Sequence, residues 1–120
     1  MKLNQYLKLN METEFTLTEI KEALVKSVVT FDPDYFKPYL FSPQVECEAT
    51  NKKVFFRYFK RMVCTAEAST IGKLSCKIES SEATEGILQY SFYDEKHLHP
   101  RLIINLKETQ ALIQIEVMPF

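Results

Sequence analysis

Two histidines beside two carboxylates suggest chemistry more directly than any other residues in this chain. His97 and His99 stand two positions apart, so in an extended segment their imidazoles point the same way and can share a metal ion. Asp94 or Glu95 would supply a third ligand. A histidine pair alone is a weak site, and we predict instead an exposed polar loop ended by Pro100, with no metal bound. Folded over a pocket, either histidine would act as a general base.

Three cysteines are the next candidates for chemistry. Cys47, Cys64 and Cys76 form no CxxC pair, so the spacing predicts neither a disulfide framework nor a zinc site. Cys47 shares one face of a predicted strand with Val45 and Ala49. Apolar neighbours raise the pKa of a thiol, which makes it a poor nucleophile or base. We therefore expect all three to be packing residues.

A stripe of basic residues follows a predicted helix, with no acidic residue before Glu67. Its members are Lys52, Lys53, Arg57, Lys60 and Arg61. Such a stripe can bind phosphate or an acidic partner. The alternative, which we favour, is a solvated helix face whose charge is balanced by nearby carboxylates. Those carboxylates would be Glu46, Glu48 or Glu79.

Aromatic side chains could line a ligand pocket, because helix and strand periodicity can direct several of them toward a shared interior. The predicted pocket residues are Tyr35, Tyr39, Phe55, Phe59, Tyr90 and Phe92. A wall of this kind favours a flat apolar ligand with one or two hydroxyl or carbonyl groups. The alternative is that these rings simply fill the core.

Length and composition describe the domain that must position these residues. The chain has 120 residues, of which 46% are hydrophobic and 26% charged, and we divide it into a tail over 1–15 and a single domain over 16–120. A net charge of −1 gives no global field for nucleic acid or an anionic membrane. The first ten residues contain no uninterrupted apolar run. We expect a cytoplasmic protein with no nucleic-acid or membrane partner and no cofactor.

Helices dominate the first half of the predicted domain. Thr16 and Glu19 form a capping box that begins an amphipathic helix. Asp32 and Pro33 then begin a second helix, which is short because Pro38 interrupts it.

Strands dominate the second half. Period-two alternation predicts a strand over 44–49, and helical spacing predicts a third helix over 52–68. Four more strands follow, over 73–80, 86–94, 101–107 and 110–118. Their connections are short, so neighbouring strands should be antiparallel. The fold class is therefore α+β, with three N-terminal helices packed on one side of a curved, mostly antiparallel sheet.

This order of elements, from Thr16 to Phe120, resembles the nuclear transport factor 2-like superfamily, which includes SnoaL-like cyclases and ketosteroid isomerases. The likeness also rests on two short stretches, Phe31–Phe36 (FDPDYF) and Leu40–Glu46 (LFSPQVE). The resemblance implies a cone, a cystatin-like α+β barrel in which a bent sheet wraps round a long helix. It also implies an apolar pocket that opens at the wide end of the cone.

The chain departs from the enzymes of that superfamily at the residues that do the chemistry. In the isomerases an acidic residue just after the pair matched here by Val45 and Glu46 abstracts a proton, and a tyrosine on the first helix holds the oxyanion. Here Cys47 follows that pair, and the predicted first helix contains no tyrosine. Dehydratase relatives pair an Asp with a His in the pocket, whereas His97 and His99 both fall in a predicted loop. We name no catalytic residue.

We interpret the chain as a non-catalytic domain that binds a small apolar ligand or a protein partner. The alternative is a cofactor-free lyase or isomerase, in which Tyr35, Tyr39, Tyr90 and a loop histidine act in a pocket of low dielectric. We also predict a homodimer through the sheet. Apolar residues, Leu112 and Met118 among them, occur on both faces of the last two strands, and helices can cover only one face.

Overall fold

The computed structural model describes residues 15–47, 50–80 and 86–118. The first described helix, α2 (Leu17–Val29), begins at the predicted capping box. The Glu19 amide donates to Thr16 Oγ1 at 3.0 Å, and the Thr16 amide donates to Glu19 Oε1 at 2.8 Å. These bonds satisfy two of the amides that a helix N-terminus leaves without partners. One face of α2 is buried, formed by Ile20, Ala23, Leu24, Ser27 and Val28.

The predicted second helix is two shorter elements. A 3₁₀ turn, η1 (Pro33–Phe36), leads directly into a single α-helical turn, α3 (Lys37–Leu40). Pro38 lies in the first turn of α3, where its missing amide proton costs no hydrogen bond, so it begins this helix rather than interrupting one. The chain reverses before η1 at Phe31, whose φ of 54° is in the left-handed region.

The long helix α4 (Lys52–Ser69) confirms the third predicted helix. Asn51 caps it, because its side-chain oxygen accepts a hydrogen bond from the Val54 amide at 2.8 Å. Its buried face consists of Phe55, Phe56, Phe59, Val63 and Ala66. Within the described ranges, no helix combines the length and the apolar character that a membrane span needs.

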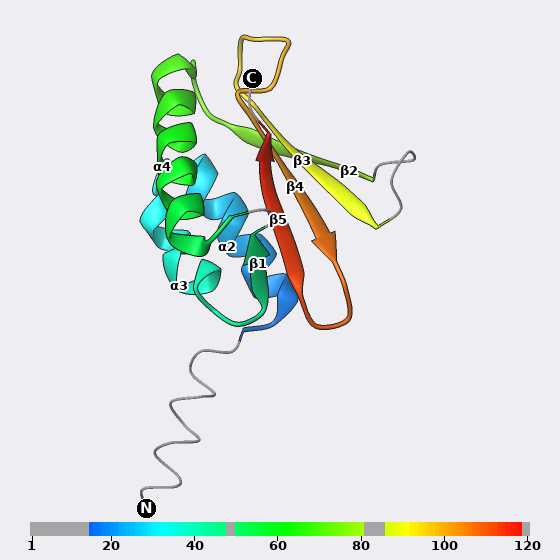
Figure 1. The fold of residues 1–120 in the computed structure, drawn as a ribbon. Helices are drawn as coiled ribbons and strands as arrows, with labels where there is room; N and C mark the ends of the chain where they lie inside the picture. The colour runs from blue at the N-terminus through cyan, green and yellow to red at the C-terminus, as the bar shows by residue number, and fades with distance from the viewer. Residues whose placement is uncertain (1–14, 48–49, 81–85, 119–120) are drawn as a thin grey trace, which may run out of the picture.

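Among the described residues, five strands form one mixed, unclosed sheet. They are β1 (Val45–Cys47), β2 (Ser75–Ser80), β3 (Ile87–Tyr93), β4 (Leu102–Glu108) and β5 (Ile113–Met118). Their order is β1-β5-β4-β3-β2. The last four pair as the predicted antiparallel meander, whereas β1 pairs with β5 in parallel (Figure 1).

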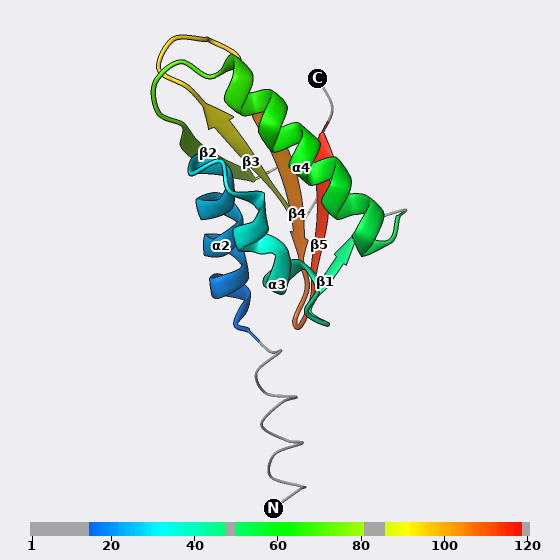
Figure 2. The same ribbon diagram turned by 90° about the vertical axis from the view of Figure 1, so that its left-hand side faces the viewer.

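The helices cover one face of this sheet, so the described chain has two layers. Figures 1 and 2 show α4 crossing that face, with α2 and α3 beside it. We call the covered face the inner face and the opposite one the outer face. On β4, Leu102, Ile104 and Leu106 point inward and are buried, whereas Ile103 and Asn105 point outward and are partly exposed. The α+β class and the one-sided helical layer agree with the prediction.

Candidate functional site

An apolar groove of about 490 Å³ lies between α2 and the edge strand β2, which are neighbours in Figure 2. Val25 and Val29 of α2 form one wall, and Ile78 of β2 and Tyr90 of β3 form the other. The rim is polar and consists of Thr18, Lys21, Glu22 and Lys26. The groove therefore has an apolar interior and a charged edge.

The groove exists because the helical layer stops short of the sheet edge. On β2, Ile78 belongs to the inner face, since it pairs with the inward-pointing Tyr90. Tyr90 is 3% exposed, but Ile78 is 52% exposed. On α2, Val25 and Val29 lie beside the buried face of the helix and are only partly covered. Three aliphatic side chains thus remain open to a ligand.

The groove also has distinct electrostatics. Burial raises the pKa of the Tyr90 hydroxyl, and the nearby Cys76 and Glu108 raise it further, so this group stays neutral at physiological pH. On the rim, Lys21 Nζ lies 3.0 Å from Glu108 Oε2. Glu22 and Lys26 carry opposite charges one helical turn apart on α2, with Lys26 Nζ over the Tyr35 ring. The charges of the rim therefore nearly cancel.

The structure does not bring the six predicted pocket residues together around one cavity. Tyr90 lines the groove, but Phe55, Phe59 and Phe92 lie in the core, with exposures of 4%, 0% and 0%. The Phe55 ring stacks on the Phe59 ring with centroids 6.1 Å apart, and Phe36 closes on the other side of Phe59 at 5.8 Å. These rings fill the space that a hollow cone would leave.

Tyr35 and Tyr39 belong to an aromatic cluster at η1 and α3, which joins the core rings because Tyr39 stacks on Phe36 with centroids 6.3 Å apart. The ring centroids of Tyr35 and Tyr39 are 6.1 Å apart, and Phe15 packs on Tyr39 at 4.4 Å. Burial and the neighbouring Tyr35 raise the pKa of the Tyr39 hydroxyl. Lys26 Nζ stands 4.7 Å from the centre of the Tyr35 ring, so this cluster touches the rim of the groove but does not line it. The three tyrosines of the enzymatic alternative are therefore not assembled in one pocket.

Sequence reasoning missed Val25, Val29 and Ile78. The sequence contained a signal for Val25 and Val29, because they make the apolar stripe of α2 wider than the face that packs on the core. Ile78 stands between Lys77 and Glu79 in the sequence, which is the pattern of a half-buried strand. That pattern does not show that the helical layer stops short of Ile78.

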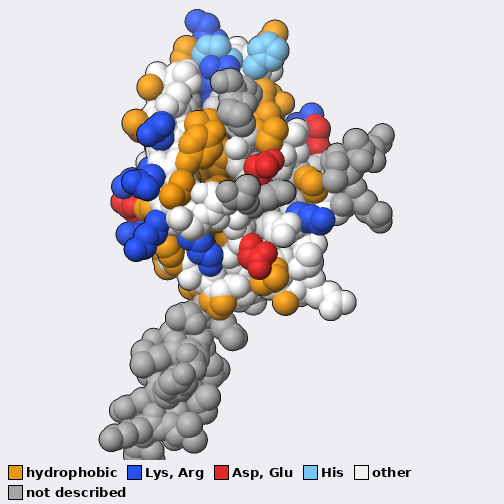
Figure 3. Space-filling model, viewed as in Figure 1, with side chains coloured by type: hydrophobic (Ala, Val, Ile, Leu, Met, Phe, Trp, Pro, Cys, Tyr) orange, Lys and Arg blue, Asp and Glu red, His pale blue; other side chains and the backbone are white. Residues whose placement is uncertain are grey.

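The basic stripe of α4 is not balanced in the predicted way. Figure 3 shows Lys and Arg side chains gathered along the side of the molecule that α4 forms. Glu79 instead pairs with Lys77 at 2.9 Å, and Glu48 lies outside the described residues. The acid that reaches the stripe is Asp34 of η1, 3.8 Å from Lys60 Nζ. Lys52 leaves the stripe, because its Nζ donates to the Ser42 carbonyl at 2.6 Å.

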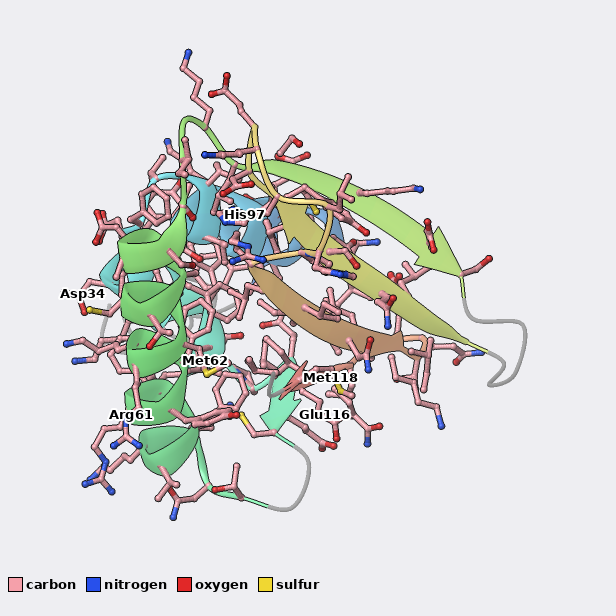
Figure 4. The ribbon with its side chains drawn as sticks, turned by 90° about the horizontal axis from the view of Figure 1, so that it is seen from above. Asp34, Arg61, Met62, His97, Glu116 and Met118 are labelled. Carbon is pink, nitrogen blue, oxygen red and sulfur yellow. The ribbon has the colours of Figure 1, made fainter. Side chains whose placement is uncertain are left out.

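Asp94 and His97 form a hydrogen-bonded pair in the loop after β3, where Figure 4 labels His97. Asp94 Oδ2 lies 2.6 Å from His97 Nδ1 and accepts from the Ile71 amide at 2.9 Å. Asp94 Oδ1 accepts from the amides of Lys96 and His97 at 3.1 and 2.7 Å. A carboxylate of this kind can orient a histidine base, but three of its four hydrogen bonds come from backbone amides.

The electrostatics of Asp94 point to a structural clamp. Burial by itself raises the pKa of this carboxyl, but the hydrogen bonds from His97, Ile71 and Lys96 together outweigh burial and lower it well below its usual range. The clamp joins the loop after α4 to the loop after β3, and the Glu95 amide adds a bond to the Ile71 carbonyl at 3.1 Å. The groove between α2 and β2 does not include His97.

A metal site at this loop would need a third ligand. Among residues 15–47, 50–80 and 86–118, no group of three His, Cys, Asp or Glu side chains is arranged to hold a metal ion. Leu98, between the two histidines, is almost fully exposed, as the predicted polar loop requires. The loop therefore has the exposure expected of a connection between strands.

The cysteines divide into two environments. Cys47 and Cys76 are half-buried on the inner face, and burial raises the pKa of each thiol to about 11. Lys52 opposes this shift at Cys47 without cancelling it. Cys64 is exposed on α4, contrary to the expectation that all three cysteines are buried. The raised pKa of Cys47 agrees with the prediction that this residue is a poor nucleophile.

Comparison with protein-family models, with curated proteins and with solved structures finds no match to this chain. A function can therefore be proposed from the geometry of the groove, the clamp and the basic stripe.

Proposed function

We propose that this protein is a non-catalytic binding domain that takes a small apolar ligand in the groove between α2 and β2. The observation that carries the proposal is the groove itself, with a volume of about 490 Å³ and walls of Val25, Val29, Ile78 and Tyr90. Pockets for small ligands have volumes of roughly 300–1,000 Å³ and mainly apolar walls with a few polar groups. The groove meets both criteria.

The rim argues for a ligand without net charge. Lys21 is neutralised by Glu108, and Glu22 lies one helical turn before Lys26, so a charged headgroup gains little at this edge. The Tyr90 hydroxyl can exchange a hydrogen bond with one hydroxyl or carbonyl group of the ligand. A flat apolar molecule with such a group is the chemistry we propose.

The domain is also proposed to belong to the nuclear transport factor 2-like superfamily, with its cone-shaped, cystatin-like arrangement. Support comes from the one-sided helical layer, from the long helix α4 across the inner face, and from the mixed sheet in which β1 lies beside β5. The tightly packed rings around Phe59 mean that ligands would enter at the edge groove rather than at the centre of a cone.

A second copy of the chain is the proposed partner of the outer sheet face. Half-buried apolar residues stand there without a helical cover, namely Ile87, Tyr93, Ile103 and Met118, and the half-buried Leu112 lies just before β5. Figure 4 shows Glu116 and Met118 on the side of β5 away from α4. Asn105 Oδ1 is buried on this face without a hydrogen-bond partner among the described residues, and a facing copy can supply the donor.

Binding of 6-propionyl-2-(dimethylamino)naphthalene, a flat uncharged dye with one carbonyl group, followed by fluorescence and by NMR shifts of backbone amides, tests the groove. Ile78→Gln should weaken binding about tenfold, since it removes roughly 1–2 kcal/mol of apolar contact. Ile71→Gln is the matched control, because Ile71 is 48% exposed and lies outside the groove. Equal effects of the two changes, or shifts confined to the outer face, would contradict the proposal.

A further inference from the structure

A second hollow lies on the opposite side of the helical layer from the sheet, between α3 and α4. It has a volume of about 570 Å³ and is lined by Lys37, Phe41, Lys53, Phe56 and Arg57. A smaller hollow of about 250 Å³ adjoins it and is lined by Val54, Arg57, Tyr58 and Arg61. Arg57 borders both, so the two hollows form one continuous surface along α4. We call it the basic surface.

The charge of this surface is local and nearly uncompensated. Lys53, Arg57 and Arg61 form no ion pair with a described residue, and Lys60 has Asp34 as its partner at 3.8 Å in an exposed position. An exposed pair at that separation offsets little charge. The whole chain carries a net charge of −1, so this surface is more positive than the molecule as a whole.

The basic surface also presents an aromatic anchor. The Phe41 ring is 41% exposed and meets the Phe56 ring edge-on, with centroids 6.3 Å apart and planes at 69°. Phe56 is buried beneath it. The buried Phe56 ring holds the exposed Phe41 ring in place, so a partner that covers Phe41 loses little conformational entropy there. Such a preordered, exposed aromatic ring is suited to a binding contact.

We propose that the basic surface binds an acidic protein segment that places an apolar side chain against Phe41. Carboxylates of the segment pair with Arg57 and Arg61, whose guanidinium groups bind a carboxylate through two parallel hydrogen bonds. Lys53 adds a third positive charge at the rim of the larger hollow. The apolar side chain fills that hollow, so charge sets the direction of approach and the anchor sets specificity.

The rings of this surface disfavour single-stranded nucleic acid. Bases stack on free aromatic faces. Here Phe56 is buried, with Lys37 Nζ and Lys60 Nζ 5.5 and 5.6 Å from the centre of its ring, so of the two rings that line the larger hollow Phe41 alone is exposed for a base to stack on. An anionic membrane is disfavoured as well, because the apolar face of α4 is turned into the core and leaves just Phe41 and Val54 to insert into lipid.

Fluorescence anisotropy with a labelled peptide, Glu-Glu-Asp-Phe-Leu-Glu-Glu, tests the proposal on the full chain at low and physiological salt. The double variant R57Q/R61Q should lower affinity at least tenfold, and Phe41→Ala should lower it several-fold without changing the salt dependence. The double variant K73Q/K96Q is the matched control, because it removes the same charge from exposed positions elsewhere and should leave affinity unchanged. Circular dichroism confirms that each variant is folded.

Three results would overturn the proposal. The peptide could fail to bind at submillimolar concentration, or K73Q/K96Q could weaken it as much as R57Q/R61Q does, which would mean a diffuse charge effect. An oligo-dT strand or phosphatidylserine vesicles could bind more tightly than the peptide and lose affinity in R57Q/R61Q, which would assign the surface to nucleic acid or lipid. If R57Q/R61Q loses peptide binding but still binds the dye in the groove, the basic surface and the groove of the proposed function are separate sites.

Discussion

The two faces of the sheet are built from similar residues but behave differently. Ile104 and Ile103 are neighbours on β4, yet Ile104 is completely buried on the inner face while Ile103 is partly exposed on the outer face. Ile78 is on the inner face as well, but it is open because it lies beyond the helices. Burial in this protein is therefore decided by how far the helical layer extends. Function is expected where that layer ends.

The largest effect on stability is expected from a change in the core between the helices and the inner face. Phe59→Ala removes a fully buried ring that stacks on Phe55 and touches Phe36. It should lower the free energy of unfolding by about 3–5 kcal/mol, the usual cost of such a cavity. Urea denaturation measures the loss. Tyr58→Ala, a neighbouring change at a half-exposed ring, should cost clearly less, and comparable losses would mean that the core around Phe59 is not tightly packed.

A smaller loss of stability is expected at the clamp beyond the sheet end. Asp94→Asn replaces an acceptor of four hydrogen bonds and should lower the melting temperature. His97→Ala should lower it less, because the three backbone donors remain. A His97→Ala effect equal to that of Asp94→Asn would show that the side-chain pair, rather than the backbone clamp, stabilises these loops.

The same clamp sets a pH dependence. The pKa of Asp94 is lower in the folded chain than its ordinary value of 3.8, so its ionised form stabilises the fold above that pH. This contribution is lost as the pH falls below 3.8. Thermal melts between pH 7 and pH 3 should therefore show a smaller decrease for Asp94→Asn than for the unmodified chain, and parallel curves would exclude this role.

A moderate effect on assembly is expected at the outer face. Leu112→Glu or Met118→Glu should weaken the proposed homodimer at least tenfold, because each places a charge in an apolar contact. Analytical ultracentrifugation measures the dissociation constant, and Lys107→Glu on the same face controls for charge alone. An unmodified chain that sediments as a monomer at high micromolar concentration would remove the dimer from the proposal.

The smallest effect is expected at Cys47. Cys47→Ala should cost about 1 kcal/mol of stability, as small truncations at half-buried positions do. Since burial raises the pKa of Cys47 and Cys76 to about 11, a disulfide reagent at pH 8 should label Cys64 rapidly and the other two slowly. Labelling of Cys47 faster than a free model thiol would reopen a nucleophilic role.

Local patterns predicted most of the fold. The capping box at Thr16, the spacing of α4 and the alternation of β3 to β5 each depend on neighbours in sequence, and each is found where expected. Pro38 was placed wrongly because a proline that ends one helical turn can also begin the next.

The candidate site was less predictable than the fold. Periodicity tells which face Phe59 occupies but not whether the rings of Phe36 from η1 and Phe55 from α4 close on it or leave a cavity. The exposure of Ile78 depends on where α2 ends across the sheet, and the partner of Lys60 is Asp34, which comes from a different helix. These are properties of tertiary arrangement, which a single sequence leaves open.

The parallel pairing of β1 with β5 bears on the order of events in folding. Val45 lies opposite Ile113 and Cys47 opposite Ile115, so the two paired strands are far apart in the sequence. Local contacts can form α2, α3 and α4, whereas β1 has β5 as its strand partner in the described sheet and cannot pair before β5 is in place. Closing so long a loop is entropically slow. The edge of the sheet at β1 is therefore expected to close late in folding, and intermediates that precede this step expose the apolar faces of the helices.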